Sequence, residues 1–408
     1  MFSKEEKEKL IEGLKKLYKD INESDILFSF CPYRVCPVGA HIDHQLGKVT
    51  GFAINRGITI AYFPNNNSLF EATSLNFDGV KNNDILNIGE KQNDWADYLR
   101  GTAKLLYEKY GITKGINCVI NGSLPIGGVS SSAAVVIAFM NALCEVNNLK
   151  LTNEEVISLA QEVENKYVGV NSGRLDQSCE VLSKKGNLLS LDIGRHEYEL
   201  IPQNPNMLPY KIGIFFSGVK RTLVGSAYNN RVEELKMAAN LLRTYGGVPC
   251  TKYEDTYLRD VPRDLYRRYG DKLPENLRKR AEHYYSEMSR VGQALHYWDF
   301  GDIKNFGKVV FESGDSSIKN YEAGSKELKV LHHIMKQTKG VYGGRMSGAG
   351  FKGCYLGIIN PDYEESIKEE VTRKYLEMFP EHNDTFEIFY CDTADGLDIE
   401  NKTYVKTR

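Results

Sequence analysis

The sequence predicts a two-domain protein of mixed class (α/β or α+β), in which strands and helices alternate along the chain. Its 408 residues exceed what one hydrophobic core usually organises. Apolar runs of strand length, such as residues 51–63, are interspersed with stretches of helical spacing, such as residues 325–337. The apolar run at residues 210–216 opens a second series of elements. We therefore expect domains of residues 1–195 and 196–408.

The first domain begins with an amphipathic helix, because Leu10 and Leu14 recur at helical spacing among lysines and glutamates. Gly111 ends a later helix, and Thr152 with Glu155 forms a capping box that starts another. In order, the expected elements are a helix at residues 4–20, strands at 25–30, 51–63 and 69–75, a helix at 94–110, a strand at 115–120, helices starting near 133 and 153, and a strand at 187–192.

The second domain is expected to be richer in helices. Residues 247–280 are rich in charge and short of long apolar periods, which indicates a solvated helical excursion. The remaining elements are a strand at residues 210–216, helices at 278–299, 303–312 and 325–337, and a strand at 354–359.

The bulk composition excludes several functional classes. Lysine plus arginine (52) nearly balance aspartate plus glutamate (54), and no long stretch is strongly basic, so nucleic-acid binding has no electrostatic support. The longest apolar run, residues 133–140, is far shorter than a membrane span, and the charged N-terminus lacks a signal-peptide core. We expect a cytoplasmic protein with no membrane partner. The eight cysteines lack metal-type spacing, which favours reduced thiols.

Residues 122–134 join a turn rich in glycine and serine to the start of an apolar helix. Gly127 and Gly128 let the backbone bend sharply and approach a ligand, while Ser130 to Ser132 offer hydroxyls and unpaired N–H groups. A helix N-terminus favours phosphate through such donors and through the helix dipole. The stretch predicts a phosphate-binding turn, although a serine N-cap after a loop has the same local pattern.

Three further turns place polar or small residues between apolar strands. Residues 33–47 hold Arg34, and residues 168–177 bring Asp176 to a glycine-bounded turn. A second glycine cluster, residues 343–353, leads directly into a strand. Polar groups this dense in loops usually face a ligand.

The first of these turns also carries metal-ligand residue types in His41, Asp43 and His44. No further histidine or cysteine cluster completes a ligand set, so we rank metal binding there below contact with a ligand. Loop aspartates and histidines also often bond to their own backbone.

These turns supply the groups that phosphoryl transfer requires: a phosphate cradle, magnesium ligands, a group that orients the nucleophile, and a cation. Ser132 and Glu164 offer the hard oxygens that Mg²⁺ prefers, with phosphate and water completing its shell. Asp176 would hold or deprotonate the acceptor hydroxyl, and Arg34 would stabilise the ionised acid and the developing phosphate charge. The common P-loop string and the protein-kinase motifs are absent.

Three motifs resemble, in the same order, those of the GHMP kinases, the family of galactokinase, homoserine kinase, mevalonate kinase and phosphomevalonate kinase. Residues 34–43 (Arg-Val-Cys-Pro-Val-Gly-Ala-His-Ile-Asp) resemble the galactokinase signature, residues 124–134 the phosphate loop, and residues 344–353 the C-terminal glycine loop. Residues 217–231 and 280–290 also resemble galactokinases. The resemblance implies an N-terminal ribosomal-protein-S5-like domain and a C-terminal ferredoxin-like domain, with the active site in the cleft between them.

The same resemblance implies roles for individual residues. Asp176 and Arg34 would be catalytic, Ser132 and Glu164 would hold Mg²⁺, and ATP and a sugar or sugar acid would be the substrates of a chain that we expect to be monomeric. The implied nucleotide contacts are Gly127, Gly128, Val129, Ser130, Ser131 and Ser132. The implied sugar contacts are Ala40, His41, Asp43, His44, Gly173, Asp176, Tyr228 and Gly348.

One position departs from the galactokinase pattern. Galactokinases carry Glu-His-Thr-Asp-Tyr where this chain has Ala40-His-Ile-Asp-His44, so the glutamate that accepts a hydrogen bond from the sugar 6-hydroxyl is absent. A C6 carboxylate would be repelled by glutamate but tolerated by alanine, with like charges costing on the order of several kcal/mol in a partly dry site. Plant galacturonate kinases carry a similar run. We therefore expect D-galacturonate as substrate, with His44, Lys220 or Arg174 as candidate positive charges.

Three other functions fit parts of the same pattern. Galactokinase, or a kinase for another galactose-like sugar such as arabinose, is the nearest, since water could fill the space beside Ala40. A non-catalytic sensor that binds sugar and ATP is the second, although the intact Glu164 and Asp176 argue against it. A structural domain whose glycines only shape turns is the third.

Overall fold

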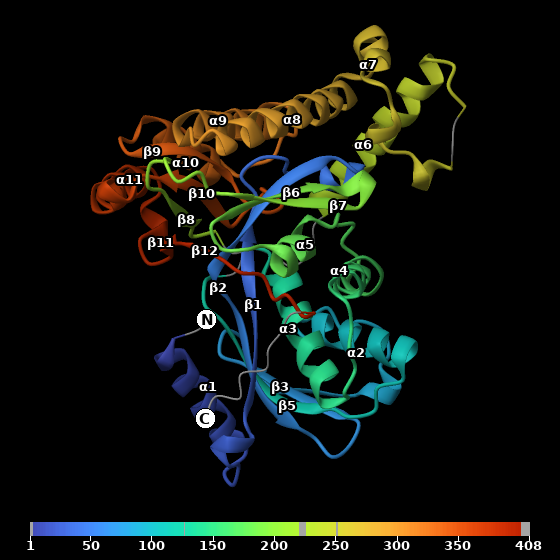
Figure 1. Ribbon diagram of the computed structural model, residues 1–408, viewed down its shortest axis with the longest axis vertical. Helices are drawn as coiled ribbons and strands as arrows, with labels where there is room; N and C mark the ends of the chain where they lie inside the picture. The colour runs from blue at the N-terminus through green and yellow to red at the C-terminus, as the bar shows by residue number, and fades with distance from the viewer. Residues whose placement is uncertain (1–2, 126, 220–225, 250–251, 401–408) are drawn as a thin grey trace.

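The computed structural model describes residues 3–125, 127–219, 226–249 and 252–400, and its strands form two sheets (Figure 1). The larger sheet has the order β4-β3-β5-β2-β6-β7, with β1 and β12 also paired to β2. Its pairs are antiparallel except for β3 with β5. The strands are β1 (Leu27–Val35), β2 (Lys48–Pro64), β3 (Leu69–Ser74), β4 (Lys81–Asp84), β5 (Ile116–Gly122), β6 (Asn187–Asp192), β7 (Glu197–Pro202) and β12 (Thr393–Ala394).

The smaller sheet is antiparallel and has the order β11-β8-β10-β9. Counted along the chain this is 4-1-3-2, and helices follow its first and third strands, which is the ferredoxin-like arrangement. The strands are β8 (Lys211–Ser217), β9 (Val341–Met346), β10 (Cys354–Ile359) and β11 (Phe386–Cys391).

Helices cover both sheets. Those of the first half are α1 (Lys4–Leu17), α2 (Asp97–Tyr110), α3 (Ser131–Val146), α4 (Asn153–Glu162), the π-helical turn η4 (Val163–Val168) and α5 (Leu175–Leu182). Those of the second half are α6 (Ser226–Tyr245), α7 (Arg263–Tyr269), α8 (Glu275–Asp299), α9 (Ile303–Lys319), α10 (Lys326–Gln337) and α11 (Glu364–Met378). Figure 1 shows α8 and α9 side by side along one end of the molecule, with α7 projecting beyond them.

Most elements lie where the sequence predicts them. Gly111 ends α2 in the left-handed conformation (φ +67°), and the capping box of Thr152 and Glu155 starts α4. The second glycine cluster is different, because its first residues form strand β9 and only the residues after Met346 form a turn. Gly343 serves packing instead: a Cβ there would lie 2.2 Å from the Gly307 carbonyl oxygen of α9.

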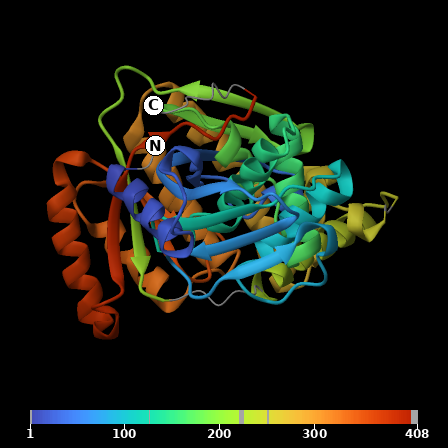
Figure 2. The same ribbon diagram turned by 90° about the horizontal axis from the view of Figure 1, so that it is seen from below.

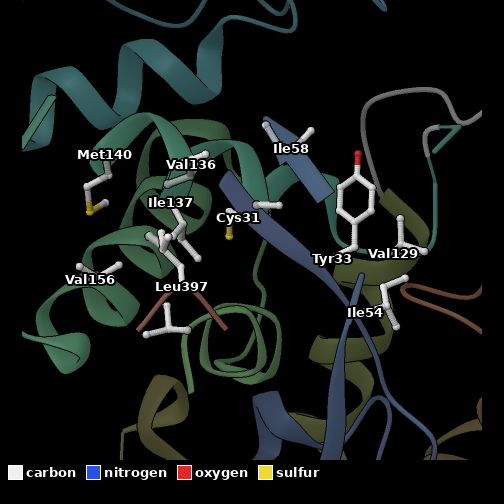
Figure 3. Close-up of a cluster of buried hydrophobic side chains, with 14 of the residues drawn as sticks. Cys31, Tyr33, Ile54, Ile58, Val129, Val136, Ile137, Met140, Val156 and Leu397 are labelled. Carbon is white, nitrogen blue, oxygen red and sulfur yellow. The ribbon is translucent and has the colours of Figure 1, made fainter. Parts of the chain in front are cut away.

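The C-terminal segment returns from the second sheet to the first half of the chain, as Figure 2 shows from below. β12 pairs with β2, and the backbone N–H of Leu397 donates to the carbonyl of Glu180 on α5. Leu397 lies in the same buried hydrophobic cluster as residues of α3 (Figure 3). The division between residues 195 and 196 stays a proposal, since β7 lies after it yet pairs with β6.

None of the described helices combines the length and apolar composition needed to cross a membrane. The seven cysteines within the described ranges are buried and free, and Cys250 lies outside those ranges.

Candidate active site

The N-terminus of α3 is left open by the residue that precedes it. Ser130 adopts the left-handed conformation (φ +64°), and its side chain makes no capping hydrogen bond to the helix. Its hydroxyl donates instead to Oδ2 of Asp176. The first N–H groups of a helix have no partner within the helix. They therefore face the turn of Gly127 and Gly128 and can receive an anion such as phosphate.

The two glycine-rich turns are in contact. Gly128 (φ +91°) and Gly348 (φ +64°) lie so close that a Cβ on Gly348 would be 2.8 Å from Cα of Gly128. A Cβ on Gly353 would similarly be 2.8 Å from the carbonyl carbon of Gly127. The hydroxyl of Ser347 donates to the carbonyl of Gly128 at 2.6 Å, which ties the turns together. Only residues without a side chain fit this approach.

Arg34 of β1 and Asp176 of α5 form an ion pair beside these turns. Nε of Arg34 donates to Oδ1 of Asp176 at 2.7 Å, and a second guanidinium nitrogen donates to the carbonyl of Gly128 at 3.1 Å. Burial lowers the pKa of Arg34, but the nearby carboxylate of Asp176 outweighs this and raises the pKa overall. The Asp176 side chain remains 23 % exposed, so a substrate can reach it. Val129 is buried and accepts the backbone N–H of Arg34 at 3.3 Å.

Asp43 lies against the turn that precedes α5. A Cβ on Gly173 would be 2.3 Å from Oδ2 of Asp43, so a glycine is needed there, and the backbone N–H of Leu175 donates to the same oxygen at 3.4 Å. Burial, followed by the charge of Asp176, raises the pKa of Asp43 to about 6. Two carboxyl groups from separate turns therefore lie near each other, and one of them resists ionisation.

Asp43→Asn is expected to increase the free energy of unfolding at pH 7.5. The folded-state pKa of Asp43 lies above its unfolded value of 3.8, so the folded state binds more protons and loses stability as pH rises from about 3.8 to about 6. Removing this ionisation should stabilise the fold by on the order of 2 kcal/mol, measured by urea denaturation. Asp192→Asn is the contrast: it is also buried, but it pairs with Arg259 at 2.9 Å, so its loss should destabilise. Equal effects of the two variants would contradict the prediction.

The two histidines of the first loop are buried and neutral. His41 (φ +66°) stacks on Tyr321 with ring centroids 4.1 Å apart, and its Nε2 donates to the carbonyl of Gly348 at 3.1 Å. Burial, and then the charge of Arg345, holds its pKa well below the usual value. Burial also lowers the pKa of His44 to about 3. His44 is therefore neutral in this structure, and its role as the positive charge for a sugar carboxylate stays a prediction.

Of the other candidate cations, Arg174 already pairs with Glu154 at 2.7 Å, and Lys220 lies outside the described residues. Tyr228, on α6, is half-buried and meets the ring of His44 edge-on with centroids 5.8 Å apart.

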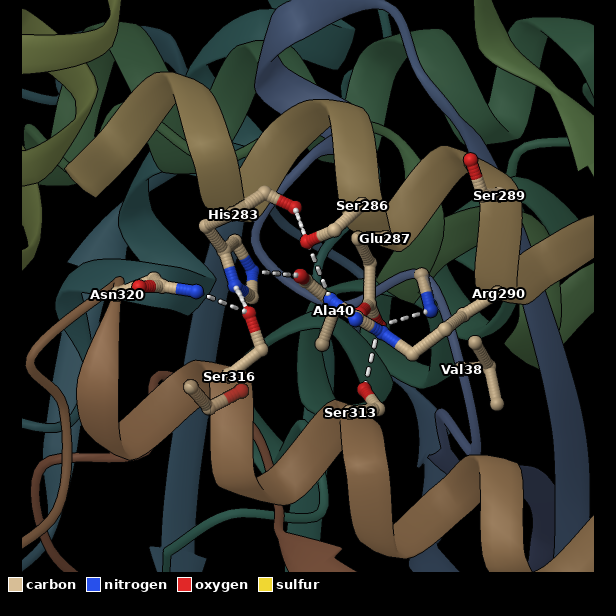
Figure 4. A network of polar contacts seen from close by, with 12 residues as sticks. Val38, Ala40, His283, Ser286, Glu287, Ser289, Arg290, Ser313, Ser316 and Asn320 are labelled. Atoms are coloured by element: carbon tan, nitrogen blue, oxygen red, sulfur yellow. Dashed lines mark hydrogen bonds and ion pairs between the residues drawn. The ribbon is translucent and has the colours of Figure 1, made fainter. Parts of the chain in front are cut away.

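Helix α8 holds the backbone of the first loop, which sequence reasoning did not foresee (Figure 4). His283 donates from Nε2 to the carbonyl of Ala40 at 3.1 Å, and Glu287 accepts the N–H of Gly39 at 2.8 Å. Burial alone would raise the pKa of Glu287. The nearby Arg290, His283 and Arg345 outweigh burial and lower this pKa to about 2. Glu287 is thus an ionised anchor, and the only sequence signal for it was the galactokinase-like run at residues 280–290.

Glu164 and Ser132 lie on separate elements, η4 and α3. Glu164 is buried in η4, where one carboxylate oxygen accepts from Gln177 at 2.5 Å and from Ser172 at 3.3 Å. Ser132 is half-buried in the first turn of α3. Each side chain offers the kind of hard oxygen that Mg²⁺ prefers where phosphate and water complete its shell. Within the described ranges, no three His, Cys, Asp or Glu side chains are grouped to hold a metal, which leaves the metal alternative at His41, Asp43 and His44 unsupported.

A cavity of about 590 Å³ extends from the first turn of α3. Ser131, Ser132 and Gly353 are among the residues that line it. The lining also includes five aromatic residues, Tyr33, Phe77, Trp95, Tyr98 and Phe216. Such a cavity suits a nucleobase attached to a phosphate chain at the glycine-rich turns.

Comparison with known proteins agrees with this geometry. The model of the GHMP kinases N terminal domain matches residues 97–184, and that of the GHMP kinases C terminal domain matches residues 294–377. A galacturonokinase of Arabidopsis thaliana is 34% identical over 403 residues, covering 93% of this chain and 94% of the relative. A galactokinase of Clostridium perfringens strain SM101 is 33% identical over 359 residues, covering 86% and 90%.

Solved structures extend the comparison to the whole fold. Lactococcus lactis galactokinase, complexed with galactose, matches with a TM-score of 0.85 and 27% identity, covering 94% of this chain and 97% of that one. Methanococcus jannaschii mevalonate kinase shares the fold at a TM-score of 0.62 and 17% identity, covering 91% and 98%. The chain belongs to the GHMP kinase family, and the predicted two-domain fold is confirmed. Within that family it is a sugar kinase, and kinases of this family use ATP as a substrate.

Proposed function

We propose that this kinase phosphorylates the anomeric hydroxyl of D-galacturonate, giving D-galacturonate 1-phosphate. The observation that carries the choice of sugar is Ala40, a small buried side chain where galactokinases carry a glutamate. The relative at 34% identity that is named galacturonokinase supports the same choice. Alanine leaves neither the negative charge nor the bulk that would oppose a C6 carboxylate.

The residues of the site divide the chemistry among them. Asp176 would accept the proton of the sugar hydroxyl or orient that hydroxyl, and Arg34 would hold the Asp176 carboxylate in place and offset charge on the transferring phosphoryl group. The N-terminus of α3 and the turns of Gly128 and Gly348 would hold the ATP phosphates. Mg²⁺ held by Ser132 and Glu164 would neutralise phosphate charge.

The direct test compares ATP turnover with D-galacturonate and with galactose at equal concentrations. We expect kcat/KM to be higher for galacturonate, and a preference for galactose of about tenfold or more would end the substrate proposal.

Ala40→Glu should lower kcat/KM for galacturonate by at least ~10-fold and raise it for galactose, because it restores a carboxylate that repels the acid and accepts from a 6-hydroxyl. Ala40→Gln is the matched control, since it adds the same volume without the charge. If the two variants discriminate between the sugars equally, steric bulk rather than charge selects the substrate.

Galactokinase activity is the second candidate. The 33% identity to a Clostridium perfringens galactokinase and the match to the Lactococcus lactis enzyme complexed with galactose favour it. Galacturonate has a C6 carboxylate that galactose lacks. Arg174, which is paired with Glu154, and the neutral His44 do not offer a free cation to that carboxylate. Both sugars therefore belong in the same assay.

A further inference from the structure

Two side chains of helix α8 hold the short segment of residues 39–40, and the proposed chemistry uses neither of them (Figure 4). Glu287 accepts the N–H of Gly39 at 2.8 Å, and His283 donates to the carbonyl of Ala40 at 3.1 Å. The two side chains are four residues apart on α8, so they project from the same face of the helix. One holds the first N–H of the segment and the other its last carbonyl, and the segment is therefore fixed at both ends.

The backbone around Ala40 adopts a conformation that needs such support. Gly39 (φ +99°) and His41 (φ +66°) both lie in the left-handed region, which a histidine adopts only rarely. A Cβ on Gly39 would be 2.6 Å from Cα of Val49, so the segment also packs directly against β2. Backbone of this kind persists only where the surrounding contacts hold it. We therefore expect the segment to move when a contact from α8 is removed.

Glu287 is itself fixed by other donors. Its side chain is fully buried. Ser313 and Arg345 donate to the same carboxylate oxygen that accepts from Gly39, and Arg290 donates to the other oxygen at 2.7 Å. Hydrogen bonds to an ionised acceptor are the stronger kind, and these come from both α9 and β9 as well as from α8. The carboxylate therefore has a single orientation in which to hold Gly39.

His283 has one proton arrangement that satisfies its neighbours. A carbonyl can only accept, so the bond to Ala40 requires the hydrogen on Nε2. The oxygen of Ser316 accepts from the amide of Asn320 at 3.2 Å, and its hydroxyl hydrogen is directed to Nδ1 of His283 at 3.0 Å. Burial lowers the pKa of His283 to about 4, so the ring is neutral near pH 7 and keeps this arrangement.

We infer that His283 and Glu287 are positioning residues for sugar selection: by fixing both ends of residues 39–40, they set how closely the side chain at position 40 approaches the C6 group of the sugar. The inference rests on the proposed function, in which Ala40 faces that group. Both residues act through the loop, since their polar atoms are occupied by its backbone and by α9. A small displacement of a positioned group has a large effect on a binding site.

The test removes the contact to Ala40 with and without replacing the donor. His283→Met has a similar volume but no donor, so the Kd for the preferred sugar, measured by calorimetry without nucleotide, should rise about tenfold. The ratio of kcat/KM for galacturonate to that for galactose should approach one, while KM for ATP stays within about twofold. His283→Gln places an amide N–H near the position of Nε2 and should keep the Kd and the ratio within about threefold of wild type.

His332→Met is the matched control for lost stability. His332 is a buried histidine on α10 that is bonded at both ring nitrogens, to Tyr355 at 2.8 Å and to Asp315 at 2.9 Å. This variant should lose a comparable amount of Tm and keep the sugar Kd and the ratio. Wild-type values of both in His283→Met, or the same change in His332→Met, would overturn the inference.

A milder variant covers the case in which His283→Met does not fold. Ser316→Ala adds no bulk and removes the donor to Nδ1 of His283, so the sugar Kd should rise about threefold. An unchanged Kd would overturn the inference. The proposed function can fail separately: if wild type prefers galactose, the galacturonate proposal ends, but the change in the ratio between wild type and His283→Met still decides whether α8 positions the loop. The Kd needs no turnover, so the comparison also holds for a protein that binds sugar without phosphorylating it.

Discussion

Asp176→Asn should lower kcat by at least ~10²-fold while ATP still binds, because the variant keeps the shape of the side chain but cannot accept a proton. Asp176 is not among the residues that line the cavity proposed for the nucleobase, so ATP should still raise the Tm. The buried Arg34 loses its ion-pair partner, so some stability should be lost as well. The measurements are steady-state kcat with the preferred sugar, Tm with and without ATP, and urea denaturation.

The control for this variant is Asp20→Asn, which makes the same chemical change at an exposed position. It should leave kcat and Tm unaltered. Full activity in Asp176→Asn would remove Asp176 from its assigned role. Wild-type protein that binds ATP and sugar without turnover would instead favour the sensor alternative.

The local chemistry of the site was predictable because the residues responsible for it are close together in the sequence. Glycines and serines before an apolar helix indicate a phosphate turn whichever fold carries them, and the structure places Ser130 and Gly128 at such a helix N-terminus. The contact of Gly128 with Gly348 was expected only through the family resemblance. Nothing local in either turn specifies the other.

Properties that depend on distant packing were not predictable. Glu287 lies 248 positions from Gly39, whose backbone it holds, so no local pattern connects them. The neutrality of His44 follows from burial, which its polar neighbours in the sequence do not reveal. Gly343 looked like part of a loop, yet it allows β9 to pack against α9. In each case the outcome depends on how the chain packs and not on neighbouring residues in the sequence.

Gly348→Ala is expected to reduce kcat/KM for ATP by ~10²-fold, the scale of a displacement of about 1 Å in a positioned group. The new Cβ would meet Cα and the carbonyl oxygen of Gly128 at 2.8 and 3.0 Å. These are backbone atoms that cannot rotate away, so the two turns must separate. Overpacking should also cost about 1–3 kcal/mol of stability, measurable by urea denaturation.

Gly186→Ala separates this effect from backbone strain alone. Gly186 also has a positive φ (+72°), but a Cβ there would meet nothing within 4 Å. Gly186→Ala should therefore lose only the stability that a left-handed alanine costs, about 1–2 kcal/mol, and its kcat/KM for ATP should stay unchanged. If both variants lose stability equally and both keep kcat/KM for ATP, the contact between the turns does not hold the triphosphate. A loss confined to Gly348→Ala means that this contact is part of the ATP site, because strain is common to the two variants and the clash is not.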